Sequence, residues 1–418
     1  MRVMNILGRQ VSAEPTLFLY VIVSRCSMNG HNILLQRPRR AQSDELLSFH
    51  SEDYVETLRS TEPEAFRSSI SKYSRFGLDE DCPIFPGLFD FSRLSSGASI
   101  DSAAKLNSGH YDIAVNWAGG LHHAKKSSAS GFCYFNDCVL GILELLKVHP
   151  RVLYIDIDIH HGDGVEEAFY CTDRVMTLST HMYRPEWFFP GTGSLDEIGE
   201  GQGRGYAINV PLLEGCTDDD FMFMFKPILE KIISVFSPGA IVLQCGADGL
   251  VGDRLGSFNM TVEGHAKAVE LVRSYNIPTL VLGGGGYTKT NVARAWTLDT
   301  AALAGVDLED EIPESDYYNY FAPETSIRYN PAPRFSDFNT REELQRIRAV
   351  ILDNLSTLHT APGAHLEFHP PDSFVPHAPI GQDDEESIHN RLSLYAQTHF
   401  SHYFKCVEAG SIDPFEEI

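Results

Sequence analysis

Short β-branched runs alternate with amphipathic segments through the middle of the chain, from about residue 112 to residue 287. Several of these runs have the length and composition of buried strands, and most end in polar residues or glycine. They are residues 112–117, 152–159, 175–179, 240–245 and 279–282. Between them, apolar residues recur at helical spacing in residues 136–147, 221–236 and 262–275. This alternation is typical of βαβ units and predicts an α/β fold with a central, mostly parallel sheet.

The two ends of the chain show different patterns. Thr340 and Glu343 have the spacing of a capping box, and an apolar stripe continues to Leu355, which predicts a closing helix. Prolines and an acidic run follow, so residues 359–418 are expected to form a flexible tail. The longest apolar run, residues 17–23, is far shorter than the roughly 20 residues of a membrane span, and its composition favours a strand.

Composition narrows the class of protein. The chain has 418 residues, of which 43% are hydrophobic and 11% aromatic, and this excludes a disordered or collagen-like protein. The 57 acidic and 33 basic side chains give a formal net charge of −24, which argues against direct binding to nucleic acid or anionic membrane. The eight cysteines form no CxxC pair, which indicates a reducing compartment and argues against a zinc ribbon or disulfide framework.

Polar clusters follow four of the predicted strands, at the edge where parallel sheets bind ligands. They are residues 119–123, 156–163, 246–248 and 283–287. Asp156, Asp158 and His160 alternate with isoleucines, so on a strand they share a face and are costly to bury without a cation or proton partner. The alternative is a strand with one solvated edge, which helices on both faces of the sheet would disfavour. With Asp248, Asp158 and His160 can form a zinc site with a fourth position open for water; magnesium, manganese and iron(II) are alternatives.

Two adjacent histidines and a tyrosine complete the candidate chemistry. His122 and His123 can be a packed structural pair, but Asp156 and Asp163 are left over after metal binding and can each orient one imidazole. One histidine could then act as general base. The glycines before Tyr287 lack the pattern of a phosphate loop. They permit close approach of the backbone to a ligand, which would let Tyr287 reach over it. The tyrosine hydroxyl could then stabilise an oxyanion. The alternative for this tyrosine is a structural anchor.

Six motifs together resemble class I zinc-dependent histone deacetylases. They are HHAKK at 122–126, GFCYFN at 131–136, YIDIDIHHGDG at 154–164, FPGTG at 189–193, GDRLG at 252–256 and GGGGYT at 283–288. They follow the family's order and spacing between about Arg37 and Pro331. The resemblance implies an arginase-like three-layer α/β fold, with helices on both faces of the sheet. It also implies hydrolysis of the acetyl amide of N6-acetyl-lysine in histones and other proteins, giving lysine and acetate.

The resemblance assigns a role to each candidate residue. The implied zinc ligands are Asp158, His160 and Asp248. The implied catalytic residues are His123 as general base and acid, His122 as its electrostatic partner, Asp163 and Asp156 as their respective carboxylates, and Tyr287 as the group that polarises the acetyl carbonyl. The implied substrate contacts are Gly131, Phe132, Phe189 and Leu255 in a tunnel and Asp81 at its rim. The implied potassium ligands are Asp156, Asp158, His160 and Ser179 at one site and Phe169, Thr172, Val175 and Tyr206 at another.

The chain departs from the family's pattern in three places. The family's first strand and its basic, proline-containing loop are not recognisable near the N-terminus. We therefore divide the chain into a divergent segment (1–36), a catalytic domain (37–358) and a tail (359–418). Arg254 is kept, but Thr290 stands where the family usually has a second basic residue, which weakens the case for inositol phosphate regulation. Between Thr180 and Phe189 the chain is about two residues longer than usual.

The resemblance also implies partners and a location. The expected partners are acetylated histone tails and co-repressor subunits that repress transcription in chromatin, with no direct nucleic acid or membrane contact. The expected location is the nucleus, with the cytoplasm as a second one. Two alternative functions stay open at this point: the chain could be an amidohydrolase that acts on acetylated polyamines, or an inactive scaffolding subunit. Asp81 favours a peptide over a polyamine, and the complete set of ligands and histidine–carboxylate pairs argues against an inactive scaffold.

Overall fold

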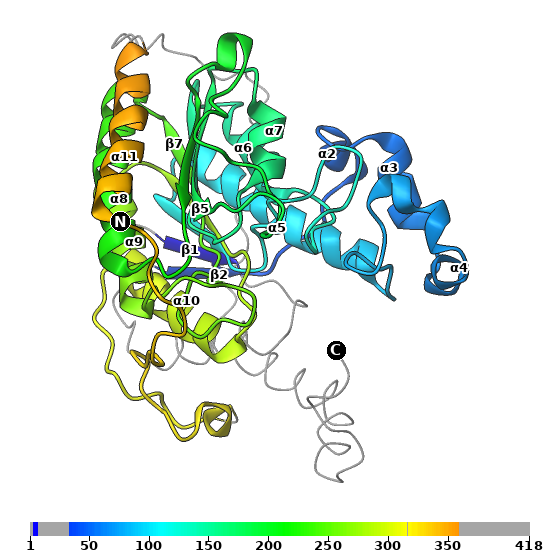
Figure 1. Cartoon of the computed structure of the whole chain (residues 1–418). Coiled ribbons are helices and arrows are strands. Elements are labelled where there is room, and N and C mark those ends of the chain that lie inside the picture. The colour runs from blue at the N-terminus through cyan, green and yellow to red at the C-terminus, as the bar shows by residue number, and fades with distance from the viewer. Residues whose placement is uncertain (1–2, 7–32, 316, 359–418) are drawn as a thin grey trace. The chain divides into compact units, whose positions relative to one another are not determined.

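The computed structural model describes residues 3–6, 33–315 and 317–358, and it is built around an eight-stranded sheet (Figure 1). The strand order is β2-β1-β3-β8-β7-β4-β5-β6, and every neighbouring pair is parallel. The strands are β1 (Val3–Ile6), β2 (Ile33–Gln36), β3 (Ile113–Asn116), β4 (Val152–Asp156), β5 (Val175–Met182), β6 (Ala207–Leu212), β7 (Ala240–Gln244) and β8 (Thr279–Leu282). The predicted parallel α/β sheet is confirmed.

Helices connect and cover these strands. The shorter ones precede β3 or follow β4, namely α2 (Ser43–Leu47), α3 (Glu52–Ser60), α4 (Pro63–Ser68) and α7 (Asp163–Phe169). The others are α5 (Leu88–Asn107), α6 (Asp137–Leu145), α8 (Asp218–Phe236), α9 (Val262–Ser274), α10 (Lys289–Ala304) and α11 (Arg341–Thr357). Short 3-10 turns lie at Ile70–Lys72, Ser74–Phe76, Gly201–Gly203 and Tyr318–Phe321. None of the helices in this part of the chain has the length and apolar character needed to cross a membrane.

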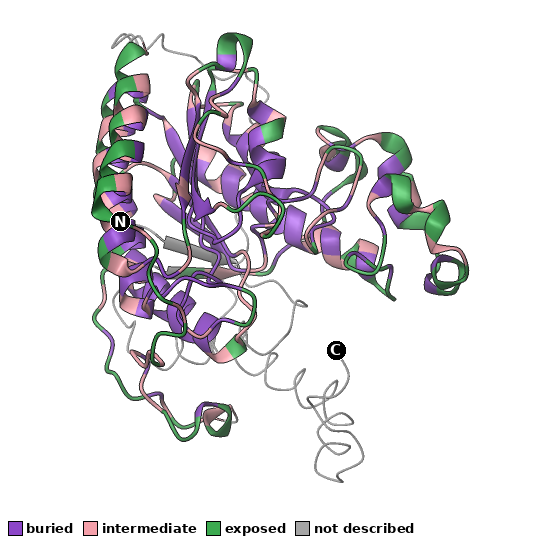
Figure 2. Ribbon diagram, in the orientation of Figure 1, coloured by how far each residue is buried: buried purple, intermediate pink, exposed green. Residues whose placement is uncertain are grey.

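Successive residues of the central strands pack against opposite layers of helices. Leu153 and Ile155 of β4 join a core with α8, α9, α10 and α11, whereas Val152 and Tyr154 join a core with α5, α6 and α7. Figure 2 shows the central strands in the colour of buried residues, with exposed residues on the outer sides of the helices. The sheet therefore has no solvated face at its centre, which confirms the three-layer arrangement.

A third core holds the segment between β3 and α6 in place. Helices α2, α3 and α4 pack with α5 against Phe135 and Ala129. Within this core the Tyr54 hydroxyl donates a hydrogen bond to the Tyr134 carbonyl oxygen at 2.7 Å. The Tyr134 hydroxyl in turn donates to the carbonyl oxygen of Pro83. These contacts fix the backbone that carries residues 131–136, one of the motifs singled out above.

Several predicted elements need correction. β4 ends at Asp156, so the predicted strand over 152–159 is too long, and Asp158 and His160 lie in the bend that follows it. β6 and the two edge-side strands β1 and β2 were not predicted, and neither were α2 to α5, α7 and α10. α10 is buried on most sides and α5 is rich in serine and alanine, so neither shows a simple apolar stripe. The predicted strand at 17–23 and the tail lie outside the described residues.

Candidate active site

The polar clusters meet because four parallel strands end at one level of the sheet. Asp156, the last residue of β4, pairs with Gln244, the last residue of β7. Gln244 pairs with Leu282 at the end of β8, and Leu282 pairs with Asn116 at the end of β3. The loops that follow these strands therefore leave the sheet side by side, as expected for the carboxyl edge of a parallel sheet.

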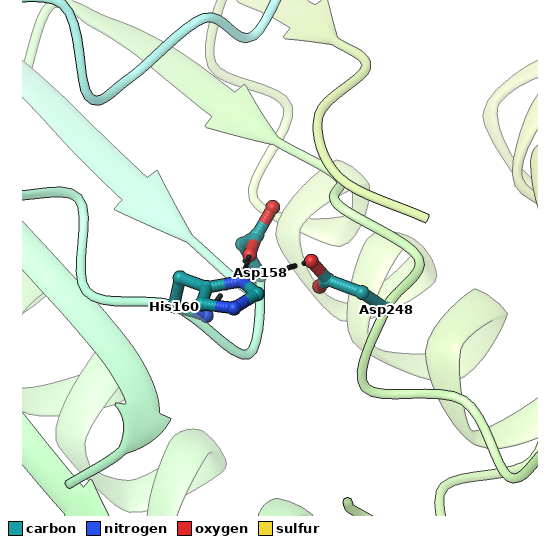
Figure 3. A group of neighbouring side chains, drawn as sticks. All are labelled: Asp158, His160 and Asp248. Atoms are coloured by element: carbon teal, nitrogen blue, oxygen red, sulfur yellow. Dashed lines mark hydrogen bonds and ion pairs between the residues drawn. The ribbon is translucent and has the colours of Figure 1, made fainter. Parts of the chain in front are cut away.

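Asp158, His160 and Asp248 form a compact group of possible metal ligands. One ligand atom from each lies within 4.8 Å of the others, and all three residues are buried (Figure 3). His160 Nδ1 lies 3.1 Å from Asp158 Oδ1 and 3.0 Å from Asp248 Oδ2. The first two residues follow β4 and the third follows β7, so the sheet itself brings them together.

The electrostatics of this group fit a cation. Burial and the neighbouring Asp158 carboxylate raise the pKa of Asp248 to about 7. Burial disfavours a charge on His160, but the Asp248 and Asp158 carboxylates raise the pKa of this imidazole to about 10. The raised pKa of His160 means that the two carboxylates favour a positive charge between them. An oxygen, nitrogen, oxygen donor set of this kind suits zinc.

Two glycines allow the backbone to approach the carboxylates closely. A Cβ atom at Gly246 would lie 1.9 Å from Asp158 Oδ2, and one at Gly285 would lie 2.1 Å from Asp248 Oδ2. With no side chain there, the Gly285 N–H donates to Asp158 Oδ2 at 2.9 Å. The Gln244 side chain donates to the same oxygen at 3.0 Å. The glycines before Tyr287 therefore also allow the backbone to contact the group of possible metal ligands.

Each of the adjacent histidines has its own carboxylate. His122 Nδ1 lies 2.7 Å from Asp156 Oδ2, and His123 Nδ1 lies 2.7 Å from Asp163 Oδ1. Burial disfavours a charge on either ring. The Asp156 carboxylate nevertheless raises the pKa of His122 to about 9, whereas burial and the His122 charge lower the pKa of His123 to about 3. The ring centroids are only 3.9 Å apart, so the pair carries one positive charge and one neutral imidazole.

Further polar residues, which were not among the predicted site residues, hold these carboxylates. The Tyr154 hydroxyl donates to Asp156 Oδ2 at 2.6 Å. Lys125 Nζ lies 2.7 Å from Asp163 Oδ2 and 3.0 Å from Glu167 Oε2. Lys125 belongs to the HHAKK motif, and Tyr154 stands two residues before Asp156 on the same strand. The sequence positions of both residues could therefore have indicated a role at the site.

A buried aspartate fixes the turn that leads into the two histidines. The Asp137 carboxylate accepts hydrogen bonds from the N–H groups of Gly120 and Leu121, and from the Ser99 hydroxyl at 2.6 Å. Gly120 has a φ of +93°, a left-handed conformation that favours glycine. The position of His122 thus depends on the first residue of α6.

The tyrosine and the two predicted tunnel phenylalanines lie around the histidines. Tyr287 is held by its backbone N–H, which donates to Asp253 Oδ2 at 2.7 Å. Burial, together with the nearby carboxylates, raises the pKa of the Tyr287 hydroxyl, which therefore stays protonated. The Phe132 ring lies 6.0 Å from the Tyr287 ring, and the Phe189 ring meets the His123 ring edge-on at 4.8 Å. Phe132 and Phe189 remain about half exposed.

The remaining predicted substrate residues lie next to these groups or on the surface. A Cβ atom at Gly131 would lie 2.5 Å from the His123 ring, so this position requires glycine. Leu255 is half exposed, and its N–H donates to the other oxygen of Asp253. Asp81 is exposed. The structure adds Phe188, which was not predicted, because its ring stacks on His160 with centroids 4.9 Å apart.

The residues implied for two potassium sites lie on adjoining segments. Asp156 of β4 is the register partner of Ser179 of β5, and the Ser179 hydroxyl lies 2.9 Å from His181 Nδ1. For the second site, the Thr172 N–H donates to the Phe169 carbonyl oxygen at the end of α7. Val175 begins β5, and the Tyr206 carbonyl oxygen accepts a hydrogen bond from Thr177.

Comparison with known proteins identifies the family. Residues 17–303 match the model of the histone deacetylase domain. The chain is 52% identical to histone deacetylase 1 of Homo sapiens, over 82% of this chain and 73% of the relative. It is 50% identical to a probable histone deacetylase 1-B of Xenopus laevis (87% and 77%) and 54% identical to histone deacetylase 9 of Arabidopsis thaliana (81% and 79%). The chain therefore belongs to the histone deacetylase family, among its class I zinc-dependent hydrolases.

Proposed function

We propose that this chain hydrolyses the acetyl amide of N6-acetyl-lysine in histones at the edge of the sheet described above. The single observation that carries the proposal is the close packing of two histidine–carboxylate pairs beside a buried group of metal ligands. The family supports histone deacetylation and chromatin-linked repression in general. The roles proposed below for individual residues are supported by their geometry and charge.

Zinc is the metal that best suits Asp158, His160 and Asp248. The three side chains supply the oxygen, nitrogen, oxygen set of an open catalytic site, and their two buried carboxylates support a divalent cation there. When bound, zinc supplies a Lewis acid for the amide carbonyl and for the attacking water. Gln244 and the Gly285 N–H hold the Asp158 carboxylate from the other side.

The two histidines divide the proton transfer and the electrostatic work. His123 is neutral, and its contact with Asp163 directs the Nδ1 proton to that carboxylate, which leaves Nε2 as the base that takes a proton from water. The same nitrogen then returns the proton to the departing lysine amine. His122 stays cationic beside Asp156 and stabilises the negative charge that develops during attack.

Tyr287 and the phenylalanines bind the acyl-lysine. Because the Tyr287 hydroxyl stays protonated, it can donate a hydrogen bond to the acetyl oxygen as charge builds there. Phe132 and Phe189, with Gly131 and Leu255, form apolar walls for the aliphatic stem of the lysine. Such walls favour the neutral acetylated side chain, because an ammonium group would lose its hydration between them.

The finer statements about substrate and cofactors are also proposals. The exposed Asp81 is suited to bind the peptide backbone, which favours acetylated histone tails over acetylated polyamines. Potassium ions are proposed at the two sites named above, whereas the weak case for inositol phosphate is unchanged. Co-repressor subunits and a nuclear location are typical of the family. The boundaries 1–36, 37–358 and 359–418 stay a prediction.

One assay tests the proposal and its alternatives. The purified full chain, supplied with zinc, is tested on an acetylated histone peptide and on an acetylated polyamine. We expect turnover of the peptide, a loss of turnover in His123→Ala, and little change in His110→Ala, whose histidine is exposed at the turn before β3. Preference for the polyamine would contradict the substrate class, and an inactive protein that binds zinc would favour a scaffold. Asp81→Asn should raise KM for the peptide, while the exposed Asp44→Asn should leave KM unchanged.

A further inference from the structure

An exposed tryptophan lies in the segment between β5 and Phe189. Trp187 is 84% exposed, more than any other large hydrophobic residue among those the structure describes. Its backbone is nevertheless held in a turn, because the N–H groups of Trp187 and Phe188 both donate to the Arg184 carbonyl oxygen, at 3.0 and 2.9 Å. An indole ring that is held in water on an ordered turn is available to contact a ligand.

The chain itself ties this ring to the entrance of the site. Phe188 stacks on His160, and the next residue, Phe189, contacts His123. The Cα atoms of Trp187 and Phe189 are separated by two peptide units and so by at most about 7.6 Å. Trp187 therefore lies close to Phe189, which is half exposed and contacts His123.

The charges next to Trp187 favour a cation. Glu186, the preceding residue, is exposed and has a φ of +75°, a conformation that defines the turn. The one basic residue of this turn, Arg184, is paired with a carboxylate, since its Nη1 lies 3.4 Å from Glu214 Oε1. The chain as a whole carries a formal net charge of −24. An aromatic face beside a free carboxylate is a suitable environment for a lysine or arginine side chain.

We propose that Trp187, together with Glu186, forms a subsite for a positively charged residue of the substrate, one or two positions from the acetyl-lysine. The inference rests on the proposed function, in which the acetyl-lysine stem enters between Phe132 and Phe189. An extended peptide advances about 3.3 Å per residue, so a residue one or two positions away is displaced by a distance comparable with the bound of about 7.6 Å between the Cα atoms of Trp187 and Phe189. The indole face attracts a cation within about 6 Å of its centre. The acidic surface attracts a basic peptide in general, whereas Trp187 binds one positively charged residue of that peptide at a defined position.

The test compares matched peptides on the zinc-loaded full chain. Each pair is identical except that one arginine near the acetyl-lysine is replaced by citrulline, which keeps the shape and removes the charge. For each protein, kcat/KM for the arginine peptide is divided by that for the citrulline peptide, so that a general loss of activity cancels. The variants are Trp187→Ala, Trp187→Phe and Glu186→Gln. Phe338→Ala, which alters another exposed aromatic residue, is the control.

The inference predicts a position-dependent ratio. We expect roughly a two- to five-fold preference for arginine at one flanking position in the unmodified chain, the size of an exposed cation–π contact. Trp187→Ala should remove most of this preference, Trp187→Phe should keep part of it, and Phe338→Ala should keep all of it. Glu186→Gln should reduce the ratio most at low salt. An unchanged ratio in Trp187→Ala would overturn the subsite, whereas an unmodified chain inactive on every peptide would contradict the proposed function instead.

Discussion

Lys125 Nζ lies 2.7 Å from Asp163 Oδ2, and the other oxygen of the same carboxylate lies 2.7 Å from His123 Nδ1. The lysine therefore holds the group that orients the proposed base, although it touches neither the ring nor the metal ligands in the contacts described. Replacing a residue that holds a catalytic group in this way commonly lowers activity ten-fold or more. Lys125 is thus a positioning residue, and its contribution can be measured.

Replacing Lys125 by methionine should lower kcat by about ten-fold with a smaller change in KM, because Asp163 is then free to turn away from His123. Lys125→Arg keeps the charge and should recover part of the rate. Lys147→Met removes a lysine that pairs with Glu144 on the surface and serves as the matched control. Equal kcat values for Lys125→Met and the unmodified chain would contradict the positioning role.

Removing the hydroxyl of Tyr287 should lower kcat by about 100-fold or more, the usual cost of losing a donor to a developing oxyanion. Tyr287→Phe keeps the ring that lies beside Phe132. Its zinc content, measured on the purified protein, should match that of the unmodified chain. Full activity of this variant would leave the tyrosine as a structural anchor, the alternative reading of its position after four glycines.

Removing the metal should destabilise the fold, because Asp158 and Asp248 are then buried without a divalent partner. A bound ion stabilises the native state by about 2.7 kcal/mol at a free concentration of 100 Kd. We expect a chelator to lower Tm by several degrees and added zinc to restore it. In Asp248→Asn, Tm should respond much less to zinc; an equal response in both proteins would place the ion elsewhere.

His50 should make stability depend on pH. Its ring is buried, its Nε2 accepts the Asn136 N–H at 3.0 Å, and burial lowers the pKa of His50 to about 4. In the unfolded chain the pKa is near 6.5, so between these values the unfolded state binds more protons and stability falls as the pH drops. At pH 5 this effect lowers the free energy of unfolding by about 2 kcal/mol, and it becomes negligible above about pH 7.5.

Urea unfolding at pH 7.5 and pH 5.0 measures this effect. His50→Gln offers an acceptor for Asn136 and a donor for the nearby Lys126 carbonyl oxygen, but it does not titrate in this range. The variant should therefore lose less stability on acidification than the unmodified chain, by about 2 kcal/mol. Groups shared by both proteins cancel in this comparison, and equal losses would show that His50 is not responsible.

Much of the fold was predictable because its signals are local. The β-branched runs that became β3, β4, β5, β7 and β8 and the apolar stripes of α6, α8, α9 and α11 depend only on neighbouring residues. Prediction from the hydrophobic pattern failed in helices whose buried residues do not recur at a regular spacing. Most residues of α10 are buried, so polar and apolar positions do not alternate, and the serine-rich α5 reads as neither helix nor strand. The extent of β4 was also misjudged, since nothing local marks its end at Asp156.

The sequence by itself determined which chemical groups follow each strand, and the family resemblance assigned them roles. Only the tertiary structure decided which of them meet. Asp248 reaches His160 because β7 lies next to β4, an adjacency set by crossover connections and not by local periodicity. Contacts such as Phe188 on His160 and Lys125 on Asp163 depend on the paths of loops. A loop's path is fixed by packing and hydrogen bonds with distant residues, which a linear pattern does not encode.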